Sequence, residues 1–242
     1  MFKGIVCITY VFRKAGVAEM KRIYGINGSP RKNKNTAQLI DQALAGAKAA
    51  FPQEEVLTER IDLYDLNYTG CRSCFACKRK GGSSYGTCAL KDELKHVLEK
   101  ILESDGVIVG SPIYFQNITG QLHSFYERLM FPYTVYSQDR SGIQEKKIPF
   151  GFLYTMNVTR QQFEQARYET FLQTWETLAK NFFGYAGSCY AFNTYQFDDY
   201  DKYVSDWFSE KEKAKYKEQH WNEDCRKAYE LGKMIAGSGD CK

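Results

Sequence analysis

The stretch IYGINGSPRKNKNTAQLI, residues 23–40, decides the fold. It opens with a short apolar run, 23–26, which is typical of a buried parallel strand. Turn-forming residues follow at 27–30, and an amphipathic helix is predicted with Asn35 as its N-cap and Gln38 at its third position. The stretch therefore predicts a strand, a polar loop and an open helix N-terminus. Unpaired backbone N–H groups and the positive end of the helix dipole favour a phosphate there.

The polar loop lacks the sequence of the two common nucleotide-binding loops. It contains no GK[ST] as in Walker A, and no G-x-G-x-x-G follows the strand. Instead it carries hydroxyl groups, amides and three cations: Ser29, Asn33, Asn35, Thr36, Arg31, Lys32 and Lys34. This composition suits a terminal monophosphate bound by hydrogen bonds without a metal, and it also suits an ordinary capped turn.

Length and composition allow one α/β domain with extensions. The 242 residues are enough to bury a full core. The formal net charge of +4 is too small to indicate a nucleic-acid partner. No stretch is long enough to cross a bilayer, and Arg13 and Lys14 interrupt the apolar first residues before any cleavage site. We therefore expect a cytoplasmic protein, away from the membrane, with reduced thiols.

Predicted strands and helices alternate along the rest of the chain. Further strands are predicted at 55–61, 107–109, 147–157 and 188–195, and helices at 90–103, 159–183 and 210–234, with another opening near Thr119. This alternation predicts an α/β fold with a doubly wound, five-stranded parallel sheet of order 2-1-3-4-5 and helices on both faces.

A second informative stretch, GSPIYFQNITGQLHSFYERL at 110–129, follows the third predicted strand. Small residues and a proline close the strand, and the aromatic pair Tyr114 and Phe115 comes next. In an open parallel sheet, ligands bind beyond the carboxyl ends of the strands at the topological switch point, which the first and third strands flank here. A phosphate loop beside an aromatic loop indicates one ligand with a phosphate and a flat ring. Flavin mononucleotide (FMN) fits this description better than other common cofactors.

Four segments resemble the flavodoxin-like NAD(P)H-dependent FMN reductase family, and more narrowly its iron–sulfur flavoprotein branch. They are 28–36, the cysteine loop at 71–88 with the KDEL that follows it, 104–120 and 227–233. The resemblance runs over most of the chain, and the two loop motifs are fairly specific when they occur together. It implies a flavodoxin-like fold, a homodimer, and electron acceptors that are unidentified in many family members.

The resemblance also suggests a division of the chain. Residues 20–197 would form the flavodoxin-like FMN-binding domain, and 198–242 a C-terminal helical extension. Residues 1–19 are predicted to be an extension or a mis-assigned start, because Met20 leads directly into the first strand.

The resemblance assigns cofactor-binding residues by motif. Those expected at the FMN phosphate are Ser29, Arg31, Asn35 and Thr36. Those expected along the ring are Pro112, Ile113, Tyr114, Phe115 and Asn117, with Thr155, Met156 and Asn157 completing the site. No side chain is assigned a catalytic role, because the flavin N5 atom would carry the chemistry.

The cysteine loop contains four of the eight cysteines: Cys71, Cys74, Cys77 and Cys88. Its C-x2-C-x2-C spacing is typical of iron–sulfur proteins, whereas four cysteines also suit zinc. Cys88 follows after ten residues, which is longer than the compact motif of the family. The sequence therefore leaves a [4Fe–4S] cluster, a zinc site and free thiols open.

The leading hypothesis from the sequence is an FMN-dependent oxidoreductase. It would take electrons from NADH, NADPH or a protein donor and reduce a quinone, a flavin, an azo or nitro compound, or a redox partner. One alternative is a non-enzymatic iron–sulfur flavoprotein that carries electrons. Another is a protein whose cysteine loop binds zinc, without redox turnover.

Overall fold

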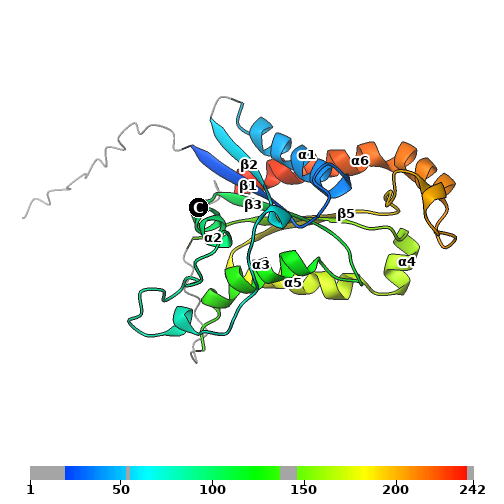
Figure 1. Cartoon of the computed structure of the whole chain (residues 1–242). Coiled ribbons are helices and arrows are strands. Elements are labelled where there is room, and N and C mark those ends of the chain that lie inside the picture. The colour runs from blue at the N-terminus through cyan, green and yellow to red at the C-terminus, as the bar shows by residue number, and fades with distance from the viewer. Residues whose placement is uncertain (1–19, 53–54, 137–145, 239–242) are drawn as a thin grey trace, which may run out of the picture.

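The computed structural model describes residues 20–52, 55–136 and 146–238 (Figure 1). The segment 1–19, predicted to be an extension or a mis-assigned start, lies outside the described residues. Within these ranges, no helix is both long enough and apolar enough to cross a membrane.

Five parallel strands form one sheet in the order β2-β1-β3-β4-β5, which confirms the predicted topology. The strands are β1 (Lys21–Asn27), β2 (Val56–Asp62), β3 (Gly106–Pro112), β4 (Phe150–Thr155) and β5 (Tyr185–Ala191). Every residue of β3 and β4 is buried, as expected for central strands that helices cover on both faces. All five strands run in the same direction, so their carboxyl ends meet along one edge of the sheet.

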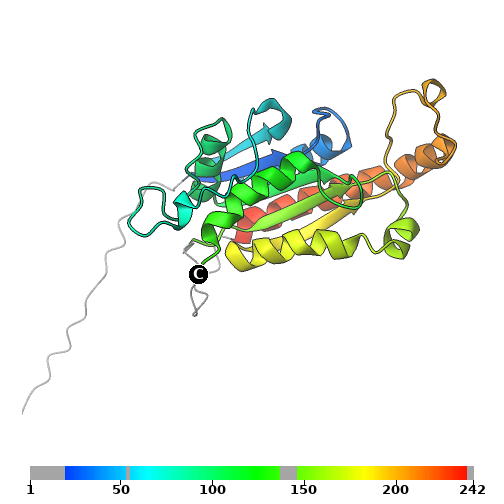
Figure 2. The same cartoon turned by 60° about the horizontal axis from the view of Figure 1, so that its bottom comes forward.

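Helices cover both faces of the sheet (Figures 1 and 2). On one face lie α1 (Asn35–Ala49) and α6 (Glu210–Gly237), and on the other lie α2 (Leu94–Glu103), α3 (Gly120–Met130) and α5 (Glu169–Phe182). The short helix α4 (Arg160–Gln165) precedes α5. The predicted doubly wound architecture is therefore confirmed.

Helices α1 and α6 touch backbone to backbone through two glycines. A Cβ atom at Gly232 would lie 1.8 Å from the carbonyl oxygen of Ala43, and one at Gly46 would lie 1.9 Å from that of Tyr229. Only residues without a side chain allow such an approach. This contact fixes α6 along the sheet, and with it the segment that joins β5 to α6.

The single long helix predicted at 159–183 is wrong, because the chain forms α4 and α5 with a turn between them. Arg167 adopts a left-handed backbone conformation with φ +53°, which interrupts the helical hydrogen bonds. The turn places the ring of Phe163 against those of Tyr168 and Phe192, with centroids 5.8 and 5.4 Å away. The apolar pattern continues across this turn, so the sequence showed one helix.

Candidate functional site

A cavity of about 720 Å³ opens at the carboxyl edge of the sheet, at the switch point between β1 and β3. Its volume lies in the range of small-molecule and cofactor sites. Eleven of the twelve predicted cofactor-binding residues line it: Ser29, Arg31, Asn35, Thr36, Pro112, Ile113, Tyr114, Phe115, Thr155, Met156 and Asn157. The structure thus brings together residues from three separate loops.

The β1–α1 loop (residues 28–34) begins with a fixed conformation. The buried Asn27 accepts a hydrogen bond from the backbone N–H of Ser29 at 3.0 Å and donates one to Asp62 at 2.7 Å. The Ser29 hydroxyl oxygen accepts a bond from the backbone N–H of Arg31 at 3.1 Å. The backbone N–H of Gly28 donates to the carbonyl oxygen of Gly110 on β3 at 2.8 Å. These bonds hold the loop at the mouth of the cavity.

Helix α1 starts one residue earlier than predicted. Its N-cap is Lys34 and not Asn35, and among the described residues no side chain caps its first N–H groups. The Asn35 amide instead donates to the carbonyl oxygen of Tyr195 at 3.0 Å, and the Gln38 amide donates to that of Asn33 at 3.1 Å. The helix N-terminus therefore faces the cavity without a capping side chain.

A pair of threonines connects the start of α1 to the end of β4. The hydroxyl oxygens of Thr36 and Thr155 lie 2.7 Å apart, and both residues are buried. This contact sets the β4 wall of the cavity against the β1–α1 loop.

The aromatic turn (residues 114–117) forms the β3 wall. The backbones of Tyr114 and Asn117 exchange two hydrogen bonds, of 2.9 and 3.1 Å. Phe115 and Gln116, between them, have φ values of +49° and +69°. Two positive values define a type I′ turn, which bulky residues adopt only at a cost. The side chain of Phe115, at the tip of this turn, is fully exposed.

Asn117, the twelfth predicted residue, shapes this turn and is not among the residues that line the cavity. Its side-chain oxygen accepts bonds from the backbone N–H of Ile118 at 2.8 Å and from the indole Nε1 of Trp175 at 2.9 Å. Trp175 comes from α5, so this contact could not be read from the motif.

The fourth wall of the cavity comes from the connection between β5 and α6, which the sequence analysis missed. The lining residues outside the prediction are Lys34, Thr194, Tyr195, Gln196, Phe197, Asp198, Tyr203 and Phe208. Topology alone was a usable signal, because the residues after the last parallel strand emerge at the same edge as the other loops.

A buried lysine joins two walls of the cavity to α6. Lys213 donates to the carbonyl oxygen of Asn157 and to the side chain of Asn193, both at 2.9 Å, and to the carbonyl oxygen of Thr194 at 3.3 Å. Burial lowers the pKa of Lys213 to about 8. The β4 and β5 loops are therefore held by one cation.

The cysteine loop forms a separate, much smaller site. Cys71, Cys74, Cys77 and Cys88 all line one cavity of about 20 Å³, which is room for about one water molecule. Among the described residues, no three histidine, cysteine, aspartate or glutamate side chains are placed so that they could hold a metal ion. Burial raises the pKa of the Cys77 thiol.

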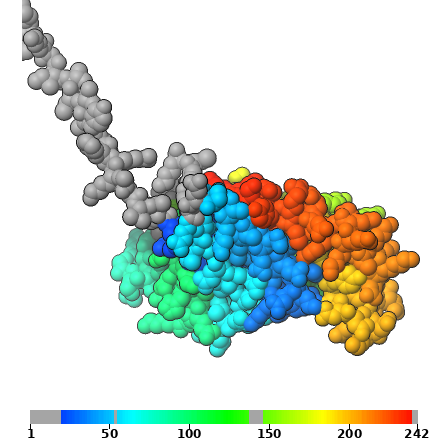
Figure 3. Space-filling view, turned by 90° about the horizontal axis from the view of Figure 1, so that it is seen from above, coloured from blue at the N-terminus to red at the C-terminus, as the bar shows by residue number. Residues whose placement is uncertain are grey.

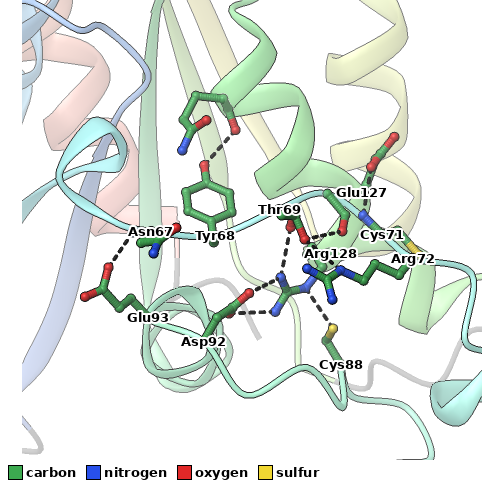
Figure 4. Close-up of polar contacts among 12 residues, drawn as sticks. Asn67, Tyr68, Thr69, Cys71, Arg72, Cys88, Asp92, Glu93, Glu127 and Arg128 are labelled. Carbon is green, nitrogen blue, oxygen red and sulfur yellow. Dashed lines mark hydrogen bonds and ion pairs between the residues drawn. The ribbon is translucent and has the colours of Figure 1, made fainter.

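Two neighbouring residues of α3 hold the two ends of the cysteine loop (Figure 4). The Glu127 carboxylate accepts a hydrogen bond from the backbone N–H of Cys71 at 2.9 Å. The Arg128 guanidinium donates to the Cys88 sulfur from Nε at 2.8 Å, and to both carboxylate oxygens of Asp92 at 2.8 and 3.0 Å. Helix α3 follows the aromatic turn, so one helix positions both sites.

Sequence comparisons give one family and several relatives. The family model described as NADPH-dependent FMN reductase matches residues 21–162, more than half of the chain. An iron–sulfur flavoprotein of Methanocaldococcus jannaschii is 36% identical over 107 residues, which are 44% of this chain and 51% of that protein. One of Archaeoglobus fulgidus is 37% identical over 111 residues, 45% of each chain. The chain spans about half the length of the curated relatives it matches.

Solved structures share the fold at low sequence identity. An azoreductase from Bacillus anthracis superposes with a TM-score of 0.57 and 17% identity, over 90% of this chain and 100% of that chain. An NAD(P)H:quinone oxidoreductase from Methanothermobacter marburgensis gives a TM-score of 0.61 and 14% identity, over 89% of this chain and 98% of that chain. At these identities the likeness supports the fold alone.

Proposed function

This chain belongs to the NADPH-dependent FMN reductase family, and from that premise we propose that it is an FMN-dependent oxidoreductase. It takes electrons from NADH or NADPH, or from a protein donor, and passes them to an acceptor. The acceptor is a quinone, a flavin, an azo or nitro compound, or a protein redox partner. When bound, FMN supplies the hydride and single-electron chemistry, and the protein supplies binding, orientation and exclusion of water.

One observation carries this proposal. The β1–α1 loop and the aromatic turn line the same cavity, at the switch point of the sheet. FMN has a phosphate monoester at one end and a flat aromatic ring at the other, so its two ends match these two walls.

The residues near the helix N-terminus fit a phosphate. Ser29, Asn35 and Thr36 offer hydroxyl and amide groups, and Arg31 offers a positive charge. The uncapped first turn of α1 adds backbone N–H groups and the positive end of the helix dipole. We assign the phosphate to these four residues.

The opposite end fits a flat ring with polar edges. We assign the ring to Pro112, Ile113, Tyr114 and Phe115, with Thr155, Met156 and Asn157 on the β4 side. The side-chain oxygen of Asn157 is buried and, among the described residues, accepts no hydrogen bond. A buried acceptor without a partner is costly, and the imide N–H of a flavin would satisfy it. We give Asn117 the different role of holding the aromatic turn.

A second candidate function is that of an iron–sulfur electron carrier. The observation in its favour is that all four thiols of the cysteine loop face one cavity. The cavity is too small for a cluster, and the thiols do not converge as ligands within the described structure. A [4Fe–4S] cluster, or a zinc ion in the third hypothesis, therefore does not fit the loop in this conformation, and we derive no step through either.

Two measurements separate these functions. Steady-state oxidation of NADPH or NADH with a quinone or flavin acceptor should proceed if the chain is a reductase, and should be absent if it only carries electrons. Iron and acid-labile sulfide per FMN, measured after purification without oxygen, test the cluster, with Cys74→Ala as the control.

A homodimer and a cytoplasmic location remain predictions from the sequence. Size-exclusion chromatography with light scattering would test the first, and cell fractionation the second.

A further inference from the structure

The crossing segment (residues 194–198) lies directly across the β1–α1 loop, although more than 150 positions separate them in the sequence. Figure 3 shows the two in contact, the β1–α1 loop in blue and the crossing segment in yellow. Three contacts join the crossing segment to this loop and to Asn35, the first residue of α1. The Asn35 amide donates to the Tyr195 carbonyl oxygen, Arg31 donates to that of Gln196, and Lys34 pairs with the Asp198 carboxylate.

These contacts use groups that the proposed phosphate site needs. Asn35 and Arg31 are assigned to the phosphate, and Lys34 lines the same cavity beside them. The partner that Lys34 has in this structure is an anion, the carboxylate of Asp198, which also lines the cavity. The remaining cation of the loop, Lys32, pairs with Asp65.

The backbone on either side of Asp198 is held in place, whereas its side chain is exposed. The hydroxyl oxygen of the buried Tyr200 accepts a bond from the backbone N–H of Gln196 at 3.1 Å. The ring of Phe197 stacks on that of Tyr203 with centroids 4.1 Å apart. The side chain of Asp198 is nevertheless 82% exposed. Its carboxylate can therefore leave Lys34 without unfolding the segment.

We propose that the Asp198 carboxylate is an internal anion that pairs with Lys34 in place of the cofactor phosphate. FMN must then displace this carboxylate to bind. This inference rests on the proposed function. A phosphate monoester carries a charge close to −2, so it competes well against one exposed carboxylate. Asp198 then weakens the binding of the phosphate end, and it leaves flavins that lack a phosphate unaffected.

The test is the affinity of Asp198→Asn for FMN and for riboflavin, measured by quenching of flavin fluorescence at low ionic strength. Exposed ion pairs shift equilibria by about two- to fivefold, so FMN should bind two- to fivefold tighter to the variant. Riboflavin, which has no phosphate, should bind equally to both proteins. The gain for FMN should shrink in high salt, because exposed charges are screened there.

The matched control is Asp201→Asn, which removes the same charge three residues further along, outside the cavity lining. It should leave the affinities for both flavins unchanged. Unchanged or weaker FMN binding by Asp198→Asn would overturn the inference, and so would an equal gain for riboflavin. If wild-type protein does not bind FMN at all, the proposed function itself fails, and the two failures are distinguishable.

Discussion

The guanidinium of Arg128 donates from Nε to the sulfur of Cys88 across 2.8 Å, with the arginine side chain fully buried. The same group donates to both carboxylate oxygens of Asp92 and to the carbonyl oxygen of Thr69 at 2.9 Å (Figure 4). One buried cation thus joins α3, the start of the cysteine loop and its end. A buried charge of this kind is tolerated only because its donors are satisfied.

Replacing this arginine should destabilise the protein at neutral pH. Arg128→Met leaves the partly buried Asp92 without its cation, and the cost should lie at the lower end of the range for a buried pair, about 3 kcal/mol. Chemical denaturation at pH 7 would measure the free energy of unfolding. The double variant with Asp92→Asn is the control and should lose less, because no charge is left unpaired. A larger loss in the double variant would contradict this account.

The same variant should show a specific dependence on pH. The hydrogen bond from Arg128 lowers the pKa of Asp92 in the folded protein. Stability from this pair is therefore present above the ordinary aspartate pKa of about 3.9, and is lost as pH falls through the lower folded value. The difference in unfolding free energy between wild type and Arg128→Met should shrink in that acid range. A difference that stays constant from pH 7 to pH 2 would disprove the linkage.

A buried carboxylate on α6 should limit stability at neutral pH. Burial raises the pKa of Asp224 to about 6, and its Oδ2 atom has no hydrogen-bond partner among the described residues. When folding raises the pKa of an acid in this way, the free energy of unfolding of the protein falls as pH rises from about 4 to 6. Asp224→Asn should therefore gain about 2–3 kcal/mol at pH 7.5 and little at pH 4. Thermal melts at both pH values check this, with Glu223→Gln as control, since the side chain of this neighbour is 43% exposed.

The glycine contact between α1 and α6 makes a prediction about packing. Gly232→Ala places a methyl group against the carbonyl oxygen of Ala43 and should cost about 1–3 kcal/mol, or more if the helices cannot separate. Gly237→Ala is the matched control in the same helix, since nothing lies within 4 Å of its Cβ position. It should be neutral or slightly stabilising. Equal melting temperatures for the two variants would show that the helices do not pack this closely.

The phosphate assignment predicts loss of cofactor without loss of fold. Each hydrogen bond to a charged group contributes about 1.5–3 kcal/mol, so Ser29→Ala with Asn35→Ala should weaken FMN binding more than a hundredfold. Flavin content after purification and circular dichroism of the same sample check both halves. A double variant that keeps its full flavin content would place the phosphate elsewhere.

Sequence patterns were sufficient for the sheet, and together with the family resemblance they gave most of the cavity lining. Apolar runs and turn residues predict the strand order, and the loops after β1 and β3 point to the switch point because parallel topology brings them together. Local patterns are therefore sufficient to locate site residues in a loop that directly follows a predicted strand. They located Ser29 and Tyr114 at the cavity, 85 positions apart in the sequence.

The features that were missed depend on contacts between distant segments. The crossing segment reaches the β1–α1 loop only through tertiary packing, and Asn117 turns away from the cavity because Trp175 on α5 binds it. Asn35 is not the N-cap of α1, because its amide donates to Tyr195. None of these partners is near in sequence, so no local pattern could indicate them.

The most direct test of the central claim is the absorption spectrum of the purified protein under anaerobic conditions, before and after one equivalent of NADPH or NADH. We predict a bound flavin spectrum at one FMN per chain, bleached by the nicotinamide and restored by a quinone. Protein that binds no FMN would contradict the assignment as an FMN oxidoreductase, and bound FMN that neither nicotinamide reduces would contradict its NAD(P)H-linked form.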